Sequence, residues 1–269
     1  MGIGCSCSHR LNRVQCQSLD AVQQKSPTIL VTTVDPSFPV EQIRLELKGY
    51  LEENKEYMNK SMLRLYKAAV ESPEQGLSTI KLKLCRMREI DWTHFSRLIS
   101  YPRLVSQVLL WKLSLTTKGF EQFCGYLPAL CTLRHLALRD VGLGYHAVQK
   151  LAGALKELTA LTHLSLTVNC LRSEHLDVLL PSIGFLQILT DFSLDENEIN
   201  DSGCPALCSL LPSLPVLTLL SLRFNSITYR GCALLLKASS KRPTLKILLE
   251  GNEIGEEDWS RLLSQASQP

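Results

Sequence analysis

The chain has 269 residues, of which 45% are hydrophobic and 20% are charged, a composition that excludes a disordered or collagen-like chain. The 29 basic and 26 acidic residues give a net charge of +3, so the charge does not indicate nucleic-acid binding. The longest uncharged apolar stretch, residues 178–190, is shorter than the roughly 20 residues that a membrane-spanning helix needs.

The first ten residues, MGIGCSCSHR, carry an acylation pattern and lack the apolar region of a secretory signal. The ten cysteines of the chain are therefore expected to be reduced thiols in the cytosol. The pattern M-G-x-x-x-[ST] predicts N-myristoylation at Gly2 after removal of Met1. Cys5 and Cys7 lie where a palmitoyl chain is commonly added, and stable anchoring requires such a second signal. This segment resembles the dual-acylation segments of Src-type kinases and G-protein α subunits.

The acylation pattern predicts that the protein lies at the cytoplasmic face of a membrane, with the plasma membrane favoured and a cytosolic pool where the chain is not acylated. A chance match to the pattern is one alternative. A metal site built from Cys5, Cys7, His9 and Cys16 is another, but these ligands are crowded and no second pair of cysteines completes a zinc site.

Three segments precede the repetitive part of the chain. Residues 1–25 are rich in Cys, Ser and Gln and predict a flexible lipidated tail. Residues 28–34 have strand character between two prolines and form either a short edge strand or an extended tether. Residues 41–72 have apolar side chains at helical spacing and predict a helix, in which Gly49 is a candidate position for a break. Within a segment of residues 26–74, this helix is expected to cap the repeats, and a partner-binding helix is the alternative.

A 28-residue period organises the rest of the chain. The segments LTHLSLTVNCL, LTDFSLDENEI and LTLLSLRFNSI place an asparagine at the same position of three successive units. Extending the spacing in both directions gives seven anchor positions: Cys85, Leu113, Val141, Asn169, Asn197, Asn225 and, one residue short of the period, Asn252. At four fixed offsets from these anchors, 27 of 28 residues are apolar, where the composition alone gives about 13.

Within each unit the apolar spacing changes from two, typical of a strand, to three and four, typical of a helix. Strand–turn–helix units of this kind stack in parallel, and right-handed crossovers place every helix on one side of the sheet. The pattern L-x-x-L-x-L-x-x-N-x-I resembles a leucine-rich repeat, and its length resembles the ribonuclease-inhibitor-like class. The resemblance covers residues 75–269, about seven repeats. It implies an α/β fold, a right-handed horseshoe with a parallel inner sheet and outer helices, but almost nothing about function.

The anchor residue changes along the array. In the family that this pattern resembles, the anchor asparagine holds the turn through side-chain bonds to the backbone. Cys85 can replace it, whereas the alkyl side chains of Leu113 and Val141 cannot make those bonds. The first half of the array is therefore expected to be less regular at its turns. The shortened last repeat is expected to be a capping unit.

The strands also predict a binding surface, because alternate residues of each strand point away from the core onto the concave side. We expect a protein partner there, since aromatic and arginine side chains are the usual hot spots of interfaces. The predicted contact residues are Lys83, Trp111, Arg139, His135, His163, Asp195, Arg223 and Phe224. Local packing of Trp111 against its neighbours is the alternative.

No catalytic motif is present among the phosphate-binding, serine-hydrolase and zinc-protease patterns. The equivalent histidines His135 and His163 are interpreted as surface residues rather than a catalytic dyad. Cys204 and Cys208 are interpreted as core thiols rather than a metal site. We therefore expect a non-enzymatic scaffold or adaptor without metal, cofactor, small-molecule substrate or nucleic acid. The alternative is a regulator of a catalytic protein, either a GTPase-activating or an enzyme-inhibiting leucine-rich repeat protein.

Overall fold

The computed structural model describes residues 40–71, 78–100, 105–114 and 116–266. The chain divides into two units, residues 1–36 and 37–269, and all described residues belong to the second. The predicted tail with Gly2, Cys5 and Cys7, and the segment 28–34, therefore lie outside the described residues.

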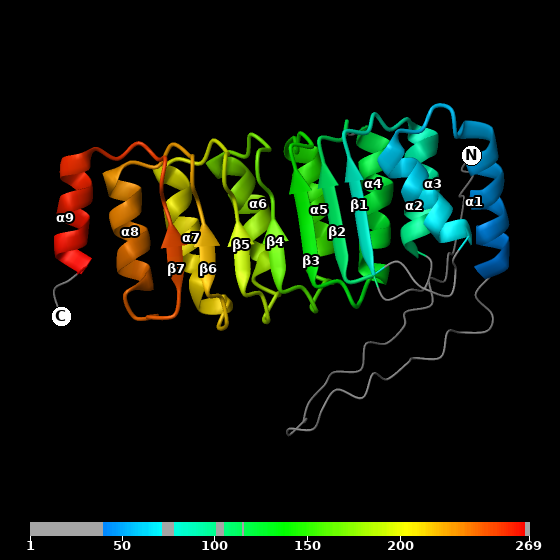
Figure 1. Cartoon of the computed structure of the whole chain (residues 1–269). Helices are drawn as coiled ribbons and strands as arrows, with labels where there is room; N and C mark the ends of the chain where they lie inside the picture. The colour runs from blue at the N-terminus through cyan, green and yellow to red at the C-terminus, as the bar shows by residue number, and fades with distance from the viewer. Residues whose placement is uncertain (1–39, 72–77, 101–104, 115, 267–269) are drawn as a thin grey trace, which may run out of the picture. The chain divides into compact units, whose positions relative to one another are not determined.

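Seven parallel strands form one sheet, in which each strand pairs with the next along the chain (Figure 1). The strands are β1 (Thr79–Lys83), β2 (Gln107–Trp111), β3 (His135–Arg139), β4 (His163–Ser165), β5 (Asp191–Ser193), β6 (Leu219–Ser221) and β7 (Lys246–Leu248). Equivalent residues pair one repeat apart, as Ile80 with Val108 and Val108 with Leu136. In the last unit, which is one residue shorter than the period, Leu219 pairs with Lys246, so the strands stay in register. The predicted period is thus the register of the sheet.

A helix follows each strand and lies on one side of the sheet (Figure 1). These helices are α3 (Glu89–Ser100), α4 (Thr117–Tyr126), α5 (Tyr145–Leu155), α6 (Ser173–Ile183), α7 (Cys204–Leu210), α8 (Tyr229–Ser239) and α9 (Glu256–Ala266). Short 3-10 helices adjoin two of them: η2 (Leu127–Ala129) follows α4, while η3 (Asp201–Gly203) and η4 (Leu211–Ser213) flank α7. The crossovers are right-handed, as parallel strands joined by helices require. The fold is a right-handed α/β leucine-rich repeat solenoid.

One apolar side chain from each helix meets the strand leucines to form a continuous core. This row is buried throughout and consists of Phe95, Phe123, Leu151, Leu179, Leu207, Leu235 and Leu262. The strand side chains that face it, such as Ile80 and Leu82 on β1, are also buried. Because a single unit cannot enclose these side chains, burial depends on the neighbouring repeats.

The turns after the strands have the same backbone at the residue before the anchor in all seven repeats, so at this position the expectation of a less regular first half is wrong. The residue before each anchor has a left-handed backbone, with φ between 52° and 58° in six repeats and 77° in the last: Leu84, Lys112, Asp140, Val168, Glu196, Phe224 and Gly251. In the first six repeats the backbone N–H of this residue donates to the carbonyl of the residue two positions before the next anchor, as Lys112 does to Arg139 at 3.0 Å. This backbone bond does not need an asparagine, which is why Leu113 and Val141 are tolerated.

The asparagine anchors add side-chain bonds in the second half of the array. Asn197 Nδ2 donates to the carbonyls of Leu166, Leu194 and Asp195, between 2.8 and 3.1 Å. Asn225 repeats this arrangement one unit later, and Asn252 in the last unit donates to the carbonyls of Leu222 and Leu249. As predicted, Cys85 makes a comparable bond, because its Sγ donates to the Lys83 carbonyl at 3.2 Å.

Two helices, α1 (Val40–Asn54) and α2 (Lys60–Glu71), precede the first strand. The predicted helix over residues 41–72 is therefore divided, and the break lies at residues 55–59 rather than at Gly49, which α1 includes. Asn59 explains the position of the break. Its Oδ1 accepts the N–H groups of Ser61 and Met62 at 3.0 Å and so caps α2.

Polar contacts join these two helices to the first repeat. Asn59 Nδ2 donates to the carbonyls of Lys83 and Leu84 at 2.9 and 3.0 Å. The Tyr50 hydroxyl donates to the buried carboxylate of Asp91 on α3. These contacts place α1 and α2 against the end of the array, as a terminal cap of a solenoid does.

Candidate interaction surface on the sheet

The face of the sheet opposite the helices carries the predicted contact residues, and the strand register brings three of them into a row. Lys83, Trp111 and Arg139 pair across β1, β2 and β3. Lys83 Nζ lies 4.8 Å from the centroid of the Trp111 ring, a cation–π arrangement. The Trp111 side chain is nevertheless 37% exposed. Trp111 therefore both contacts a neighbour and presents part of its ring to water.

A second row contains His135, His163 and Asp191 on β3, β4 and β5. The two imidazole rings lie 5.3 Å apart, and His163 Nε2 is 3.3 Å from Asp191 Oδ2. Burial and repulsion from His163 lower the pKa of His135, although Asp191 partly opposes this shift. His163 Nδ1 lies 2.8 Å from Thr162 Oγ1, and no hydrogen bond joins Ser165 to either histidine within the described part of the chain.

Both predicted arginines form ion pairs with carboxylates on the same surface. Arg139 Nη2 lies 2.9 Å from Glu196 Oε1, and Arg223 Nε lies 2.8 Å from Glu250 Oε2. Asp195 Oδ1 accepts the backbone N–H of Arg223 at 2.8 Å. These bonds fix the guanidinium groups in position, and their exposed location means that the pairs contribute little to stability.

Phe224 is the second exposed aromatic residue of this surface, with 59% of its area accessible. It occupies the left-handed turn position of its repeat, with φ of 52°. Its ring packs on Gly251, where an added Cβ would lie 2.3 Å from Phe224 Cδ1. Between the two aromatic residues, Thr167 is buried, whereas Arg139 and His163 on the central strands are exposed.

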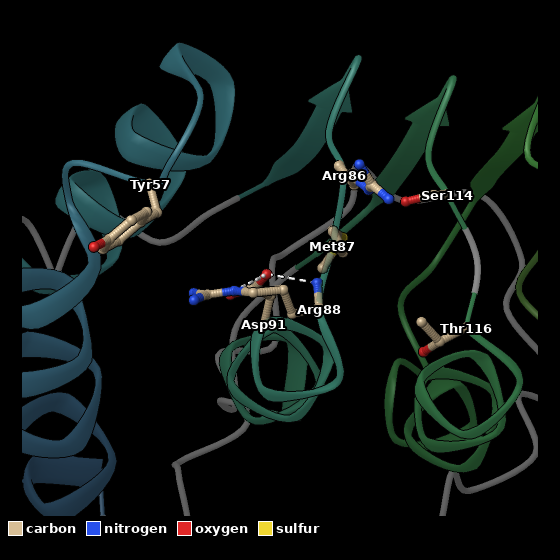
Figure 2. Close-up of a pocket in the computed structure, with 7 residues that line it drawn as sticks. All are labelled: Tyr57, Arg86, Met87, Arg88, Asp91, Ser114 and Thr116. Atoms are coloured by element: carbon tan, nitrogen blue, oxygen red, sulfur yellow. Dashed lines mark hydrogen bonds and ion pairs between the residues drawn. The ribbon is translucent and has the colours of Figure 1, made fainter.

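A pocket of about 530 Å³ lies beside this face, at the rim where β1 and β2 end (Figure 2). We call it the rim pocket, and it is lined by Tyr57, Arg86, Met87, Arg88, Asp91, Ser114 and Thr116. The sequence analysis missed it because Tyr57 lies in the loop between α1 and α2, outside the period. The charge of Arg86 and the hydroxyls of Ser114 and Thr116, one repeat further on, are the only signal that the sequence offered.

Arg88 and Asp91 form one wall of the rim pocket and satisfy each other. Arg88 Nη2 lies 2.8 Å from Asp91 Oδ1, and Arg88 Nε lies 3.1 Å from Asp91 Oδ2. The Tyr57 ring, 78% exposed, has the Arg88 guanidinium 5.7 Å from its centroid. Burial raises the pKa of Asp91, but the bonds from Arg88 and Tyr50 outweigh it, so that pKa lies below its usual value.

Cys204 and Cys208, two of the thiols that the sequence analysis considered, lie on α7. Cys204 is buried, which raises the pKa of its thiol to about 12, and burial also raises the pKa of Cys208. In residues 40–71, 78–100, 105–114 and 116–266, no group of three or more His, Cys, Asp or Glu side chains could hold a metal ion. Nor does any helix within these ranges have the length and apolar character needed to cross a bilayer.

No protein-family model and no curated protein matches this chain. Among solved structures, an internalin (inlF) from Listeria monocytogenes strain 4b F2365 is 15% identical, with a TM-score of 0.22, over 85% of this chain and 95% of that one. A TLR13–ssRNA13 complex is 14% identical, also with a TM-score of 0.22, over 60% of this chain. The match spans only 35% of the TLR13 chain. The description of the fold rests on the repeat register of this chain, and neither structure supports a statement about its ligand.

Proposed function

We propose that this chain is a non-enzymatic interaction adaptor, which binds a protein partner on the sheet face and is anchored by its N-terminus to the cytoplasmic face of a membrane. The observation that carries the first part is the exposure of Trp111 on β2 and of Phe224 in the turn after β6, while helices cover the other face of the sheet. Large apolar side chains in water cost free energy that burial at an interface recovers. Solenoids commonly bind partners on extended surfaces of this kind.

The charged side chains of the face support the same proposal. Arg139 and Arg223 are oriented by Glu196 and Glu250, so they present fixed positive and negative groups to a partner. Complementary charges of this kind set the orientation of a complex more than its affinity. A preorganised surface also loses little side-chain entropy on binding.

The anchoring part of the proposal rests on Gly2, Cys5 and Cys7 in the acylation pattern. One myristoyl chain gives only marginal and reversible membrane binding, whereas a second chain makes the attachment stable. A tethered adaptor would then hold its partner at the membrane surface. The plasma membrane is the membrane that we propose.

Membrane fractionation of cells that express the full chain tests the anchor. We expect Gly2→Ala to move the protein to the soluble fraction, while Gly4→Ala, which keeps the pattern, leaves it on membranes. Replacement of Cys5 and Cys7 by serine should weaken retention. An intact Met1 in the mass spectrum of the native protein, or equal fractionation of the two glycine variants, would contradict the anchor.

Proximity labelling with the same full chain tests the binding face. The double variant Trp111→Ala/Arg139→Ala should lose protein neighbours that the wild type labels. A matched double variant on the helix side, Leu234→Ala/Lys237→Ala, should keep them, because both residues are exposed on α8. If both variants keep the same neighbours, the sheet face is not the interface, and the helices or residues 41–72 should be tested instead.

A further inference from the structure

The first repeat carries three positive charges among its outward side chains, whereas Thr79 at the start of β1 is outward and uncharged. Lys81 and Lys83 alternate with buried residues on β1, and Arg86 is exposed just after the turn. The equivalent positions of the fifth and seventh repeats include four acidic residues: Asp195, Glu198, Glu250 and Glu253. The N-terminal end of the face is thus basic, and its charge reverses further along the sheet.

The three cations of the first repeat have no acidic partner within the described ranges. No carboxylate there lies within 4.0 Å of Lys81, Lys83 or Arg86, whereas Arg139, Arg172 and Arg223 each have one. Lys83 instead lies over the Trp111 ring, which holds its ammonium group at the surface of the sheet. Three neighbouring positive charges therefore remain available to an anion from outside the described chain.

The rim pocket extends this positive surface with hydrogen-bond donors. Figure 2 shows the Arg86 side chain directed at Ser114, on the wall that faces the second repeat. Thr116 Oγ1 accepts the N–H of Gly119 at 3.2 Å, so its own hydrogen can donate to an acceptor in the pocket. The charge of Arg88 is balanced by its ion pair with Asp91. The residues that line the pocket therefore have a net charge of one positive unit, which Arg86 supplies.

We propose that an acidic segment of a protein partner binds here, with one carboxylate in the rim pocket and further carboxylates along β1. The carboxylate in the pocket would accept bonds from Arg86, Ser114 and Thr116, an arrangement in which charge strengthens each hydrogen bond. Lys81 and Lys83 would meet the neighbouring carboxylates, and an apolar side chain of the partner would contact Trp111. This inference rests on the proposed function of the sheet face and specifies the chemistry of its partner.

Other anions fit this surface less well. The rim pocket is recessed beside the loop that carries Tyr57, where a side chain can enter but a flat bilayer cannot. A long polyanion such as a nucleic acid would extend over Asp191 and Asp195, whose carboxylates would repel it. The tail within residues 1–39 contains only two acidic residues, Asp20 and Asp35, and so does not supply the acidic segment itself.

Fluorescence titration of the full chain with a labelled dodecapeptide of alternating Glu and Asp tests the proposal. The triple variant Lys81→Gln/Lys83→Gln/Arg86→Gln should weaken binding by more than about tenfold. A control triple variant, Arg230→Gln/Lys237→Gln/Lys241→Gln, removes the same charge from exposed residues on and after α8 and should change binding less than about twofold. Tryptophan emission should change on binding, and Trp111→Phe should abolish that change because Trp92 is buried and Trp259 lies on α9 in the last repeat, away from β1 and β2.

Three results would overturn the inference. The first is no binding of the acidic peptide, or equal loss of binding in the two triple variants. The second is tighter binding of a thymidine oligonucleotide of equal charge, which would make the surface a nucleic-acid site. The third is tighter binding of phosphatidylserine vesicles, which would make it a membrane contact. None of these results would contradict the proposed function if partner labelling still depended on Trp111 and Arg139, so the two failures can be told apart.

Discussion

The side-chain oxygen of Asn197 accepts a hydrogen bond from the backbone N–H of Asn169, one repeat earlier, at 3.0 Å. The same oxygen accepts the N–H of Leu171 at 3.0 Å, while the amide nitrogen donates to three carbonyls. Each asparagine of this kind therefore joins its own turn to that of the preceding repeat. An apolar anchor cannot form such bonds itself, but Val141 still donates its backbone N–H to Asn169 Oδ1 of the next repeat at 3.0 Å.

Replacement of Asn197 by leucine should lower the free energy of unfolding by about 3 kcal/mol, because buried backbone groups lose their partners. Urea unfolding followed by circular dichroism measures this loss. The exposed substitution Gln149→Leu on α5 is the control and should have an effect near zero. Equal unfolding midpoints for the two variants would mean that the backbone ladder alone holds the turns.

Gly119 allows α4 to approach α3 closely. An added Cβ would lie 2.3 Å from the Trp92 ring and 2.7 Å from Thr116 Oγ1. Gly119→Ala should therefore destabilise the protein by about 2 kcal/mol or more through overpacking. Gly153 in α5 has no atom within 4 Å of its Cβ position, so Gly153→Ala should instead stabilise the protein by about 0.5–1 kcal/mol. Thermal unfolding of the two variants would reveal this difference in sign, and two shifts in the same direction would contradict the packing described here.

The bond from Tyr50 to Asp91 predicts a pH dependence for the cap. Burial raises the pKa of Asp91, but bonds from Arg88 and Tyr50 lower it below its usual value. Since the folded-state pKa is the lower one, this carboxylate stabilises the fold fully above its unfolded pKa of about 3.9, and the contribution is lost as the pH falls through the folded-state pKa.

Asp91→Asn should therefore cost about 2–3 kcal/mol at neutral pH, and the difference from wild type should shrink as the pH falls below about 4. Urea midpoints of both proteins between pH 3 and 7 provide the measurement. A difference that stays constant over this range would show that Asp91 acts through its shape rather than its charge.

The sequence predicted the periodic part of the molecule because each apolar row repeats one contact seven times. The offsets that placed Ile80, Val108 and Leu136 at equivalent positions are the pairings of β1, β2 and β3. The regularity of the turn at Leu113 could not be predicted from side chains, since its support is the backbone bond from Lys112 to Arg139. Contacts between non-periodic and periodic segments also escaped prediction.

The cap and the rim pocket illustrate this limit. Asn59 caps α2 and also bonds to the end of β1, and no spacing in the sequence links these two places. The rim pocket forms between the loop that carries Tyr57 and the turns of two repeats, so it depends on the same contact. For the sheet face, strand alternation predicted exposure of Trp111 and Arg139, whereas the pairing of Arg139 with Glu196 depends on side chains two repeats apart.

Site-specific photo-crosslinking in cells tests the central claim, that the sheet face binds a protein partner. Benzoylphenylalanine would replace Trp111 in the full chain, and Phe185, exposed after α6 and away from the sheet face, would be replaced in the control. We predict a discrete protein adduct from position 111 that Arg139→Ala diminishes, and no such adduct from position 185. An adduct from position 185 alone, or one from position 111 that persists unchanged with Arg139→Ala, would contradict binding on the sheet face.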